Sequence, residues 1–218
     1  MTIKKLNKKI LIPICIMAVI SIVTIYSALT YTSSELGNLA LKQGLWYLIG
    51  VCLVVFLIHM KNEYLYRHTV FLYIFGNILL LGLLLFAEPV NNSKCWFTIP
   101  GIGSIQPSEF MKIFLMLMLA TMIHNFRSDY KNPSIKQEFI FILKTLGIVS
   151  IPSILTFLQP DTGAVIIYLI IYFCMMFISG IRLRWFLIAF SIAFVFAGVV
   201  FGIYFFKQDL FIDRKSVV

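Results

Sequence analysis

Long runs of apolar residues, separated by short polar segments, make up most of the sequence. Seven such runs lie at approximately residues 10–29, 45–59, 69–87, 107–124, 139–158, 161–179 and 185–206. A helix needs about 20 mostly apolar residues to cross a bilayer, and most of these runs approach that length. The pattern therefore predicts an all-α, polytopic membrane protein with about seven transmembrane helices and no soluble domain.

A group of lysines precedes the first run, as in a secretory signal peptide: Lys4, Lys5, Lys8 and Lys9. The run is long for the apolar part of such a peptide, however, and no clear small-residue cleavage site follows it. Because six more apolar runs follow, we expect the first run to be retained as a transmembrane helix.

The composition excludes an ordinary soluble fold. Apolar residues make up 61% of the chain and charged residues 12%, against roughly 45–50% and 25% in soluble domains. The net charge is +9, but no basic face is interleaved with stacking aromatics, so we expect no nucleic-acid partner. No C-x-x-C pair occurs, and we interpret all four cysteines as structural: Cys15, Cys52, Cys95 and Cys174.

The basic residues are distributed unequally between alternate loops, and this predicts an orientation in the membrane. One set of loops and flanks holds 12 of them: Lys4, Lys5, Lys8, Lys9, Lys61, Arg67, Arg127, Lys131, Lys136, Lys144, Arg182 and Arg184. The opposite loops hold Lys42, Lys94 and Lys207. Because cytoplasmic loops are enriched in Lys and Arg, we expect a cytoplasmic N-terminus, with loops 30–44, 88–106 and 159–161 and tail 207–218 facing outward.

A short motif occurs twice, each time after an outward segment and at the start of an apolar run. The two copies are Gln106-Pro107-Ser108-Glu109 and Gln159-Pro160-Asp161-Thr162. Proline is favoured at the first helical position, and a carboxylate in the first turn interacts with unpaired backbone N–H groups. Glu109 and Asp161 could therefore be helix-capping residues without a further function.

A lysine inside the fourth run favours a functional interpretation of the first copy. Lys112 lies three residues after Glu109, so both side chains share one helix face and can pair. Ionisable residues within a span usually face a cavity or the interior of the bundle. We expect the pair to line an outward-facing polar cavity; alternatively, Lys112 extends to the headgroups.

The longest outward loop, residues 88–106, contains Lys94 and Trp96 among turn-forming residues. It could anchor the chain at the membrane interface through its aromatic residues. Alternatively, it presents Lys94 and Trp96 to a lipid-linked substrate. The three histidines are not spaced as metal ligands on one face, and we assign them no chemistry: His59, His68 and His124.

Two stretches together resemble the signature of the SEDS family (shape, elongation, division and sporulation) of bacterial cell-wall glycosyltransferases. The first stretch is Lys94-x-Trp96-Phe97, followed by Ser104-Ile105-Gln106-Pro107-Ser108-Glu109-Phe110-x-Lys112. The second is Leu158-Gln159-Pro160-Asp161-Thr162-Gly163-Ala164, followed by a span and Gly180-Ile181-Arg182. The resemblance covers about residues 10–206, and the short segment before the first run favours the rod-shape branch over the division branch.

The resemblance implies a peptidoglycan glycosyltransferase in the bacterial cytoplasmic membrane. It would polymerise undecaprenyl-linked lipid II into glycan strands on the outer face, together with a class B penicillin-binding protein. Glu109 and Lys112 match the family's paired acid and base, and Asp161 matches the acid that opens its sixth span. The implied substrate-binding or cavity residues are Lys94, Trp96, Gln106, Ser108, Glu109, Lys112, Gln159 and Asp161.

Lys94 and Lys112, together with two helix N-termini, could stabilise the negative charge that develops on the pyrophosphate leaving group. Glu109 and Asp161 would then orient Lys112 or hold a divalent metal ion. No catalytic base is assigned within the chain, because the family's base lies in the outer loop after the seventh of about ten spans.

We therefore expect residues 1–206 to be the N-terminal part of a SEDS transmembrane domain and the isolated chain to be inactive. Residues 207–218 form an outward tail, and the last six, Asp213 to Val218, resemble vector-derived sequence. A truncated gene product would account for the odd number of spans and for the missing second half of the family's fold. Two other functions remain open: a flippase for the lipid-linked precursor, and a non-enzymatic scaffold of the cell-wall synthesis complex.

Overall fold

The computed structural model describes residues 8–29, 38–60, 62–87, 93–99 and 103–215, which form seven helices and one short β-hairpin. The helices are α1 (Lys8–Leu29), α2 (Asn38–His59), α3 (Asn62–Phe86), α4 (Pro107–Asp129), α5 (Ile135–Phe157), α6 (Thr162–Ile178) and α7 (Arg184–Lys215). The hairpin pairs β1 (Phe97–Ile99) with β2 (Gly103–Ile105) in antiparallel register. The predicted all-α fold with about seven helices is confirmed.

The helix boundaries differ from the prediction at several ends. Helices α2 and α3 begin about seven residues earlier than the apolar runs, because polar residues near their starts, such as Lys42 in α2 and Glu63 in α3, interrupt the hydrophobic pattern. Helix α7 continues to Lys215, past the predicted end at residue 206. The hairpin was not predicted, since its strands are only three residues long.

In the described part of the chain, six helices are long and apolar enough to cross a membrane, namely all except α6. Helix α6 has 17 residues, which at 1.5 Å per residue gives a length of about 26 Å. That value is at the lower limit for a transmembrane helix. Helix α6 packs against α4 and α5, so it is part of the same bundle as the longer spans.

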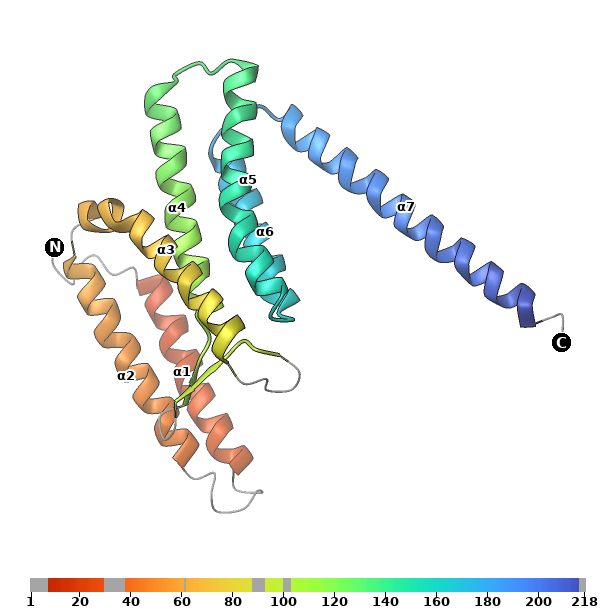
Figure 1. Ribbon diagram of the computed structural model, residues 1–218. Coiled ribbons are helices and arrows are strands. Elements are labelled where there is room, and N and C mark those ends of the chain that lie inside the picture. Colours follow the sequence, from red (N-terminus) through yellow and green to blue (C-terminus); the bar gives the residue numbers. More distant parts are fainter. Residues whose placement is uncertain (1–7, 30–37, 61, 88–92, 100–102, 216–218) are drawn as a thin grey trace.

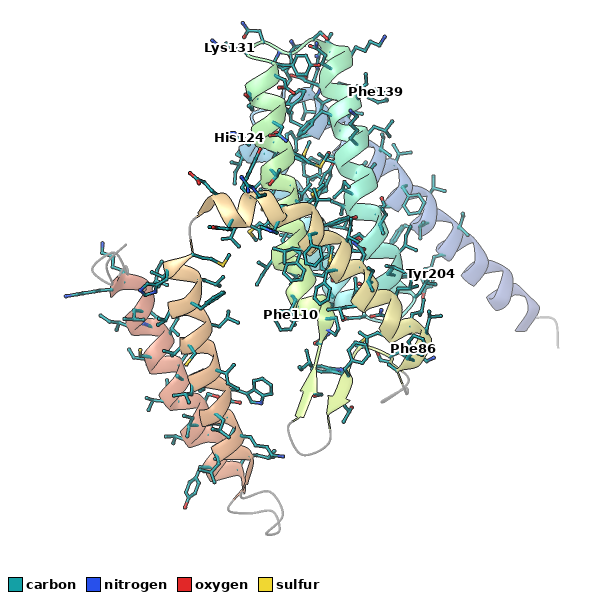
Figure 2. All side chains as sticks on the ribbon, turned by 60° about the vertical axis from the view of Figure 1, so that its left-hand side comes forward. Phe86, Phe110, His124, Lys131, Phe139 and Tyr204 are labelled. Atoms are coloured by element: carbon teal, nitrogen blue, oxygen red, sulfur yellow. The ribbon has the colours of Figure 1, made fainter. Side chains whose placement is uncertain are left out.

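Helices α3, α4, α5 and α6 pack against one another and form the body of the molecule. Helices α1 and α2 pair with each other to one side of this body, and α7 points away from it (Figure 1). Figure 2 shows the same arrangement from another side, with α1 and α2 clearly separate from α4. The central parts of α1, α2 and α7 bury none of their residues inside the structure.

Residues four positions apart form the buried stripes of the body. In α4 these are Met111, Leu115 and Leu119, each 0% exposed. In α6 the stripe is Ala164, Tyr168, Tyr172 and Met176. Rows of side chains spaced by four residues form ridges that fit into the grooves of a neighbouring helix. The core of α3–α6 is therefore formed by these rows of side chains spaced by four residues. It is not formed by helices that have one apolar and one polar face.

A glycine lets α3 approach α4 closely. A Cβ atom at Gly76 would lie 2.6 Å from the sulfur of Met111 and 2.9 Å from a ring carbon of Phe114. Both distances are shorter than van der Waals contact, so a side chain at this position requires Met111 and Phe114, or the two helices, to shift.

We predict that Gly76→Val lowers the free energy of unfolding by about 1–3 kcal/mol through overpacking of the α3–α4 contact. The measurement is unfolding of the detergent-solubilised protein. Gly147→Val in α5 is the matched control, because a Cβ there meets no heavy atom of the described residues within 4 Å. Equal losses for the two variants would contradict the prediction.

Candidate functional site

The two Gln-Pro motifs meet at the start of α4 and α6. The carboxylate of Asp161 accepts hydrogen bonds from Gln106 Nε2 at 2.8 Å and Ser108 Oγ at 3.3 Å. It also accepts one from the backbone N–H of Ala164 at 3.1 Å. Residues about 55 positions apart in the sequence are therefore joined through one carboxylate.

Capping, one of the two interpretations left open for these carboxylates, is observed for Asp161 and not for Glu109. Asp161 is the N-cap of α6, and its side chain binds the backbone of the first turn. Pro107 takes the predicted first helical position of α4, whereas Pro160 precedes α6, which begins at Thr162. The N-cap of α4 is Gln106, without a side-chain capping hydrogen bond, and the carboxylate of Glu109 pairs with Lys112.

Glu109 and Lys112 form an ion pair, as their spacing predicts. Lys112 Nζ donates to Glu109 Oε1 at 2.6 Å. The Lys112 side chain is 18% exposed and that of Glu109 is 58% exposed. The pair therefore combines a largely covered ammonium group with an accessible carboxylate in the first turns of α4, next to the Asp161 contacts.

Two of the predicted site residues are buried and contribute packing contacts. Ser108 is 1% exposed, and its carbonyl accepts a hydrogen bond from Tyr168 Oη at 3.1 Å. Gln159 is also 1% exposed, and its Nε2 donates to the carbonyl of Leu80 at 2.7 Å. These hydrogen bonds join α6 to α4 and the α5–α6 turn to α3 at the level of the two motifs.

The segment before the hairpin is fixed to the turn between α5 and α6. Ser93 Oγ and Cys95 Sγ both donate to the carbonyl of Gln159, at 2.9 and 3.2 Å. Burial raises the pKa of the Cys95 thiol, and the nearby Asp161 charge raises it further, so the thiol stays protonated at neutral pH. Cys95 is thus a packing residue, in agreement with the interpretation of the cysteines as structural.

The two loop residues expected to face substrate differ in their surroundings. Lys94 Nζ donates to the carbonyl of Leu84 near the end of α3, at 3.5 Å. Trp96 is 40% exposed. Both residues precede the hairpin, and their contact with a lipid-linked substrate remains a prediction. Loop residues 88–92 and 100–102 lie outside the described part of the chain.

Sequence reasoning missed Glu138, a buried acid on α5 that contacts the residues after α6. The signal was present, because Ser134 and Gln137 form a capping box that starts α5 before the apolar run. Starting the span at residue 139 left Glu138 in a loop. Tyr168 was also missed, since an aromatic residue inside an apolar run carries no sign that its hydroxyl bonds another helix.

The carboxylates at the motifs are already occupied by donors from the protein. Among the described residues, no group of three or more His, Cys, Asp or Glu side chains could hold a metal ion. Asp161 accepts three hydrogen bonds, and Glu109 pairs with Lys112. The geometry therefore supports the alternative in which Glu109 orients Lys112.

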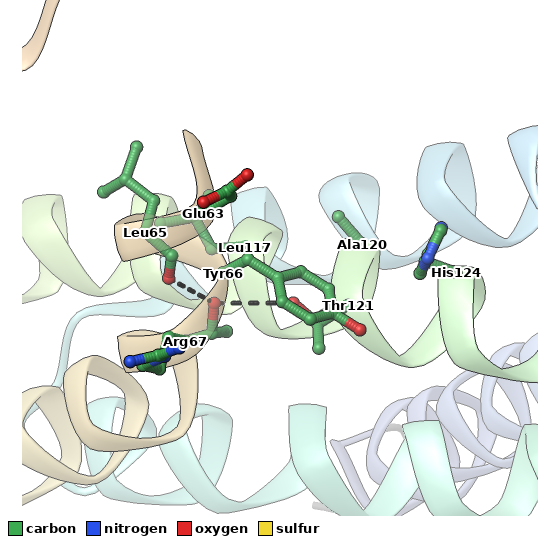
Figure 3. A pocket seen from close by; sticks show the side chains of 9 residues that line it. Glu63, Leu65, Tyr66, Arg67, Leu117, Ala120, Thr121 and His124 are labelled. Atoms are coloured by element: carbon green, nitrogen blue, oxygen red, sulfur yellow. Dashed lines mark hydrogen bonds between the residues drawn. The ribbon is translucent and has the colours of Figure 1, made fainter. Parts of the chain in front are cut away.

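A cavity of about 940 Å³ lies between α3 and α4, away from the motifs (Figure 3). Its wall combines polar groups of α3, such as Arg67 and Thr69, with residues of the C-terminal half of α4. Thr121 Oγ1 donates to Thr69 Oγ1 at 3.4 Å across this contact. The cavity does not include Glu109 or Lys112, so the polar cavity expected around that pair remains a prediction.

Comparison with known families and proteins gives consistent matches. Residues 8–215 match the family of cell cycle proteins that comprises FtsW, RodA and SpoVE. A probable peptidoglycan glycosyltransferase FtsW of Lactococcus lactis subsp. lactis is 28% identical over 201 residues, covering 83% of this chain and 48% of the relative. The peptidoglycan glycosyltransferase RodA of Treponema pallidum is 35% identical over 145 residues, covering 66% and 31%. The chain thus spans half or less of the length of these two relatives.

Two solved structures share the fold. A mutant of the rod shape determining protein RodA of Thermus thermophilus superposes with a TM-score of 0.68, covering 87% of this chain and 59% of that one at 23% identity. A chain from a peptidoglycan synthase complex superposes with a TM-score of 0.66 and the same identity, covering 86% and 53%. At 23% identity, the structural similarity shows that the helices of this chain are arranged as in these two structures.

We predict that Gln106 and Asp161 are energetically coupled. In a double-mutant cycle with Gln106→Ala and Asp161→Ala, the coupling free energy should be about 1–2 kcal/mol, since hydrogen bonds to a charged acceptor are stronger than average. The cycle is measured by unfolding in detergent. Asp129→Ala, an exposed acid at the other end of α4, should combine with Gln106→Ala additively. Additive effects for Gln106 and Asp161 would contradict the observed contact.

Proposed function

The chain belongs to the FtsW/RodA/SpoVE family, the SEDS family of the sequence analysis, and from this membership we propose that it acts in peptidoglycan polymerisation. The whole protein polymerises lipid II into glycan strands on the outer face of the bacterial cytoplasmic membrane. The relatives named above are peptidoglycan glycosyltransferases, and this supports the proposal.

The observation that carries the proposal is the Glu109–Lys112 ion pair, with its accessible carboxylate, beside the joined motifs. Lys112 supplies a cation in the first turns of α4, where the helix N-terminus adds a positive partial charge. Glu109 holds the ammonium group in place through the 2.6 Å hydrogen bond. This arrangement stabilises the negative charge that develops on a pyrophosphate leaving group when the glycosidic bond forms.

Asp161 contributes by fixing the site rather than by reacting. Its carboxylate binds donors from both motifs and caps α6. With those donors in place, the starts of α4 and α6 keep a constant separation. The orientation of Lys112 relative to α6 then requires no rearrangement during catalysis, which is the property expected of a preorganised electrostatic site.

We place the protein in cell elongation and shape rather than in division. A RodA protein that is 35% identical over 145 residues supports this proposal, and an FtsW protein that is 28% identical over 201 residues shows that relatives of both branches match the chain. A class B penicillin-binding protein that crosslinks the new strands is the proposed partner. The fold likeness to a chain of a peptidoglycan synthase complex supports a partner of that kind.

The proposed orientation places the N-terminus in the cytoplasm and both motifs on the outer side. We predict that a green fluorescent protein fused after Asn132 fluoresces, because the α4–α5 loop is cytoplasmic. Alkaline phosphatase fused after Ser104 should be active, because that loop faces outward. In the control the two reporters are exchanged, and neither should then give a signal. Alkaline phosphatase activity after Asn132 together with fluorescence after Ser104 would overturn the orientation.

We predict that Lys112→Met lowers lipid II polymerisation by about 100-fold, the scale on which one stabilising donor contributes to catalysis. The assay uses the full-length reading frame reconstituted with purified lipid II and measures glycan chains. Lys144→Met is the control, because this lysine is exposed on α5. Glu109→Gln should lower activity as well, with little change in the unfolding temperature.

The other outcomes separate the alternative functions. Loss of activity together with stability in Glu109→Gln would make the pair structural. Movement of intact lipid II across the membrane without glycan chains would identify a flippase. Normal polymerisation by Lys112→Met, with complex assembly dependent on span surfaces, would identify a scaffold.

A further inference from the structure

A second polar cluster lies at the opposite end of the body, where α5 begins and α6 connects to α7. Glu138 is 2% exposed and accepts a hydrogen bond from Trp185 Nε1 at 2.8 Å. It also lies 3.5 Å from Arg182 Nε and 3.8 Å from Arg184 Nη2. We call Arg182, Arg184 and Glu138 the arginine corner. It fixes the first turn of α7 to α5.

Further contacts hold this corner at the level where the helices end. Arg182 Nη2 donates to the carbonyl of Pro133 in the α4–α5 loop at 2.9 Å. Arg127 Nε, near the end of α4, donates to the carbonyl of Ser179 at 2.6 Å. Because α4 and α6 end here and α5 and α7 begin here, the corner lies at the depth of the lipid headgroups.

The charges at the arginine corner do not balance. Two guanidinium groups face one carboxylate, which leaves a net charge of +1. Arg184 Nε and Nη2 are buried and have no hydrogen-bond partner among the described residues, and the guanidinium carbon lies 5.7 Å from the centre of the Trp185 ring. The Arg182 and Arg184 side chains remain 46% and 40% exposed. The corner therefore has cationic surface available for an anion.

An apolar cleft adjoins the corner on its membrane side. It has a volume of about 70 Å³ and lies between α5, α6 and the first turns of α7. Ile142, Phe173 and Phe186 are among its walls, and Trp185 lines it as well. Because Trp185 also contacts Glu138 and Arg184, the cleft and the cationic surface share one side chain.

We propose that the arginine corner binds an anionic phospholipid. The phosphate lies against Arg182 and Arg184, and the first few methylene groups of one acyl chain lie in the cleft below them. A monoanionic lipid such as phosphatidylglycerol neutralises the net charge of the corner, whereas zwitterionic phosphatidylcholine does not. Free phosphate would neutralise the charge but would leave the cleft empty. Basic pockets between transmembrane helices bind acidic headgroups by the same physics.

The first test uses the fluorescence of Trp185 in lipid nanodiscs. Trp46 and Trp96, the other two tryptophans, are replaced by phenylalanine. Phosphatidylglycerol with a brominated acyl chain should quench Trp185 more strongly than brominated phosphatidylcholine at the same mole fraction. High salt should reduce the difference, because the attraction is electrostatic. Equal quenching by the two lipids at low salt would overturn the proposal.

The second test compares two charge-removing variants by the amount of phosphatidylglycerol retained in native mass spectrometry. Arg184→Gln should lower the preference for phosphatidylglycerol over phosphatidylcholine by about fivefold, as expected for the loss of one basic residue near an acidic headgroup. Lys136→Gln, an exposed lysine at the same level on α5, should leave the preference unchanged. Equal preference in Arg184→Gln and the unmodified chain, or an equal loss in both variants, would contradict a specific site. If Arg184→Gln fails to fold, the proposal is decided by the Trp185 quenching test, in which Arg182, Arg184 and Glu138 are unchanged.

Discussion

The carboxylate of Asp161 connects the two halves of the site. It accepts hydrogen bonds from the segment that opens α4 and from the first turn of α6. A carboxylate near a bilayer is costly unless its charge and lone pairs are satisfied, so its position requires these donors. The Glu109–Lys112 pair, one turn further along α4, depends on the same fixed geometry.

The requirement that polar groups be satisfied inside the protein also explains where polar side chains occur in the body. Tyr73 Oη donates to the carbonyl of Ile148, and Gln159 Nε2 donates to that of Leu80. Each of these hydrogen bonds joins an element of the body to a different one. Lipid tails are as apolar as leucine, so hydrophobic burial does not favour one partner helix over another, whereas these bonds do.

Opposite ends of the body use paired charges in different ways. At the motifs the carboxylate of Glu109 is exposed and its ammonium partner is mostly covered. At the arginine corner the carboxylate is buried and the two arginine side chains are partly exposed. The first arrangement presents a supported cation beside an accessible acid. The second secures α7 and leaves surplus positive charge at the headgroup level.

The sequence by itself determined the membrane class, the number and order of the helices and the family. These properties depend on hydrophobic length and on two motifs that are local in the chain. The pairing of Glu109 with Lys112 was also predictable, because helical spacing alone places them on one face. Capping by Asp161 was one of two open interpretations, because an acid at the start of an apolar run can bind the unpaired N–H groups of the first helical turn.

Only the tertiary structure decided which side chains of distant segments meet. Helices that are apolar on every side give no pattern from which a buried face can be chosen. The contact of Asp161 with Gln106, the burial of Ser108 and Gln159, and the attachment of Cys95 to the α5–α6 turn therefore required the packed structure. The same holds for Glu138, since its partners lie more than 40 residues away and their approach is set by how α5, α6 and α7 pack.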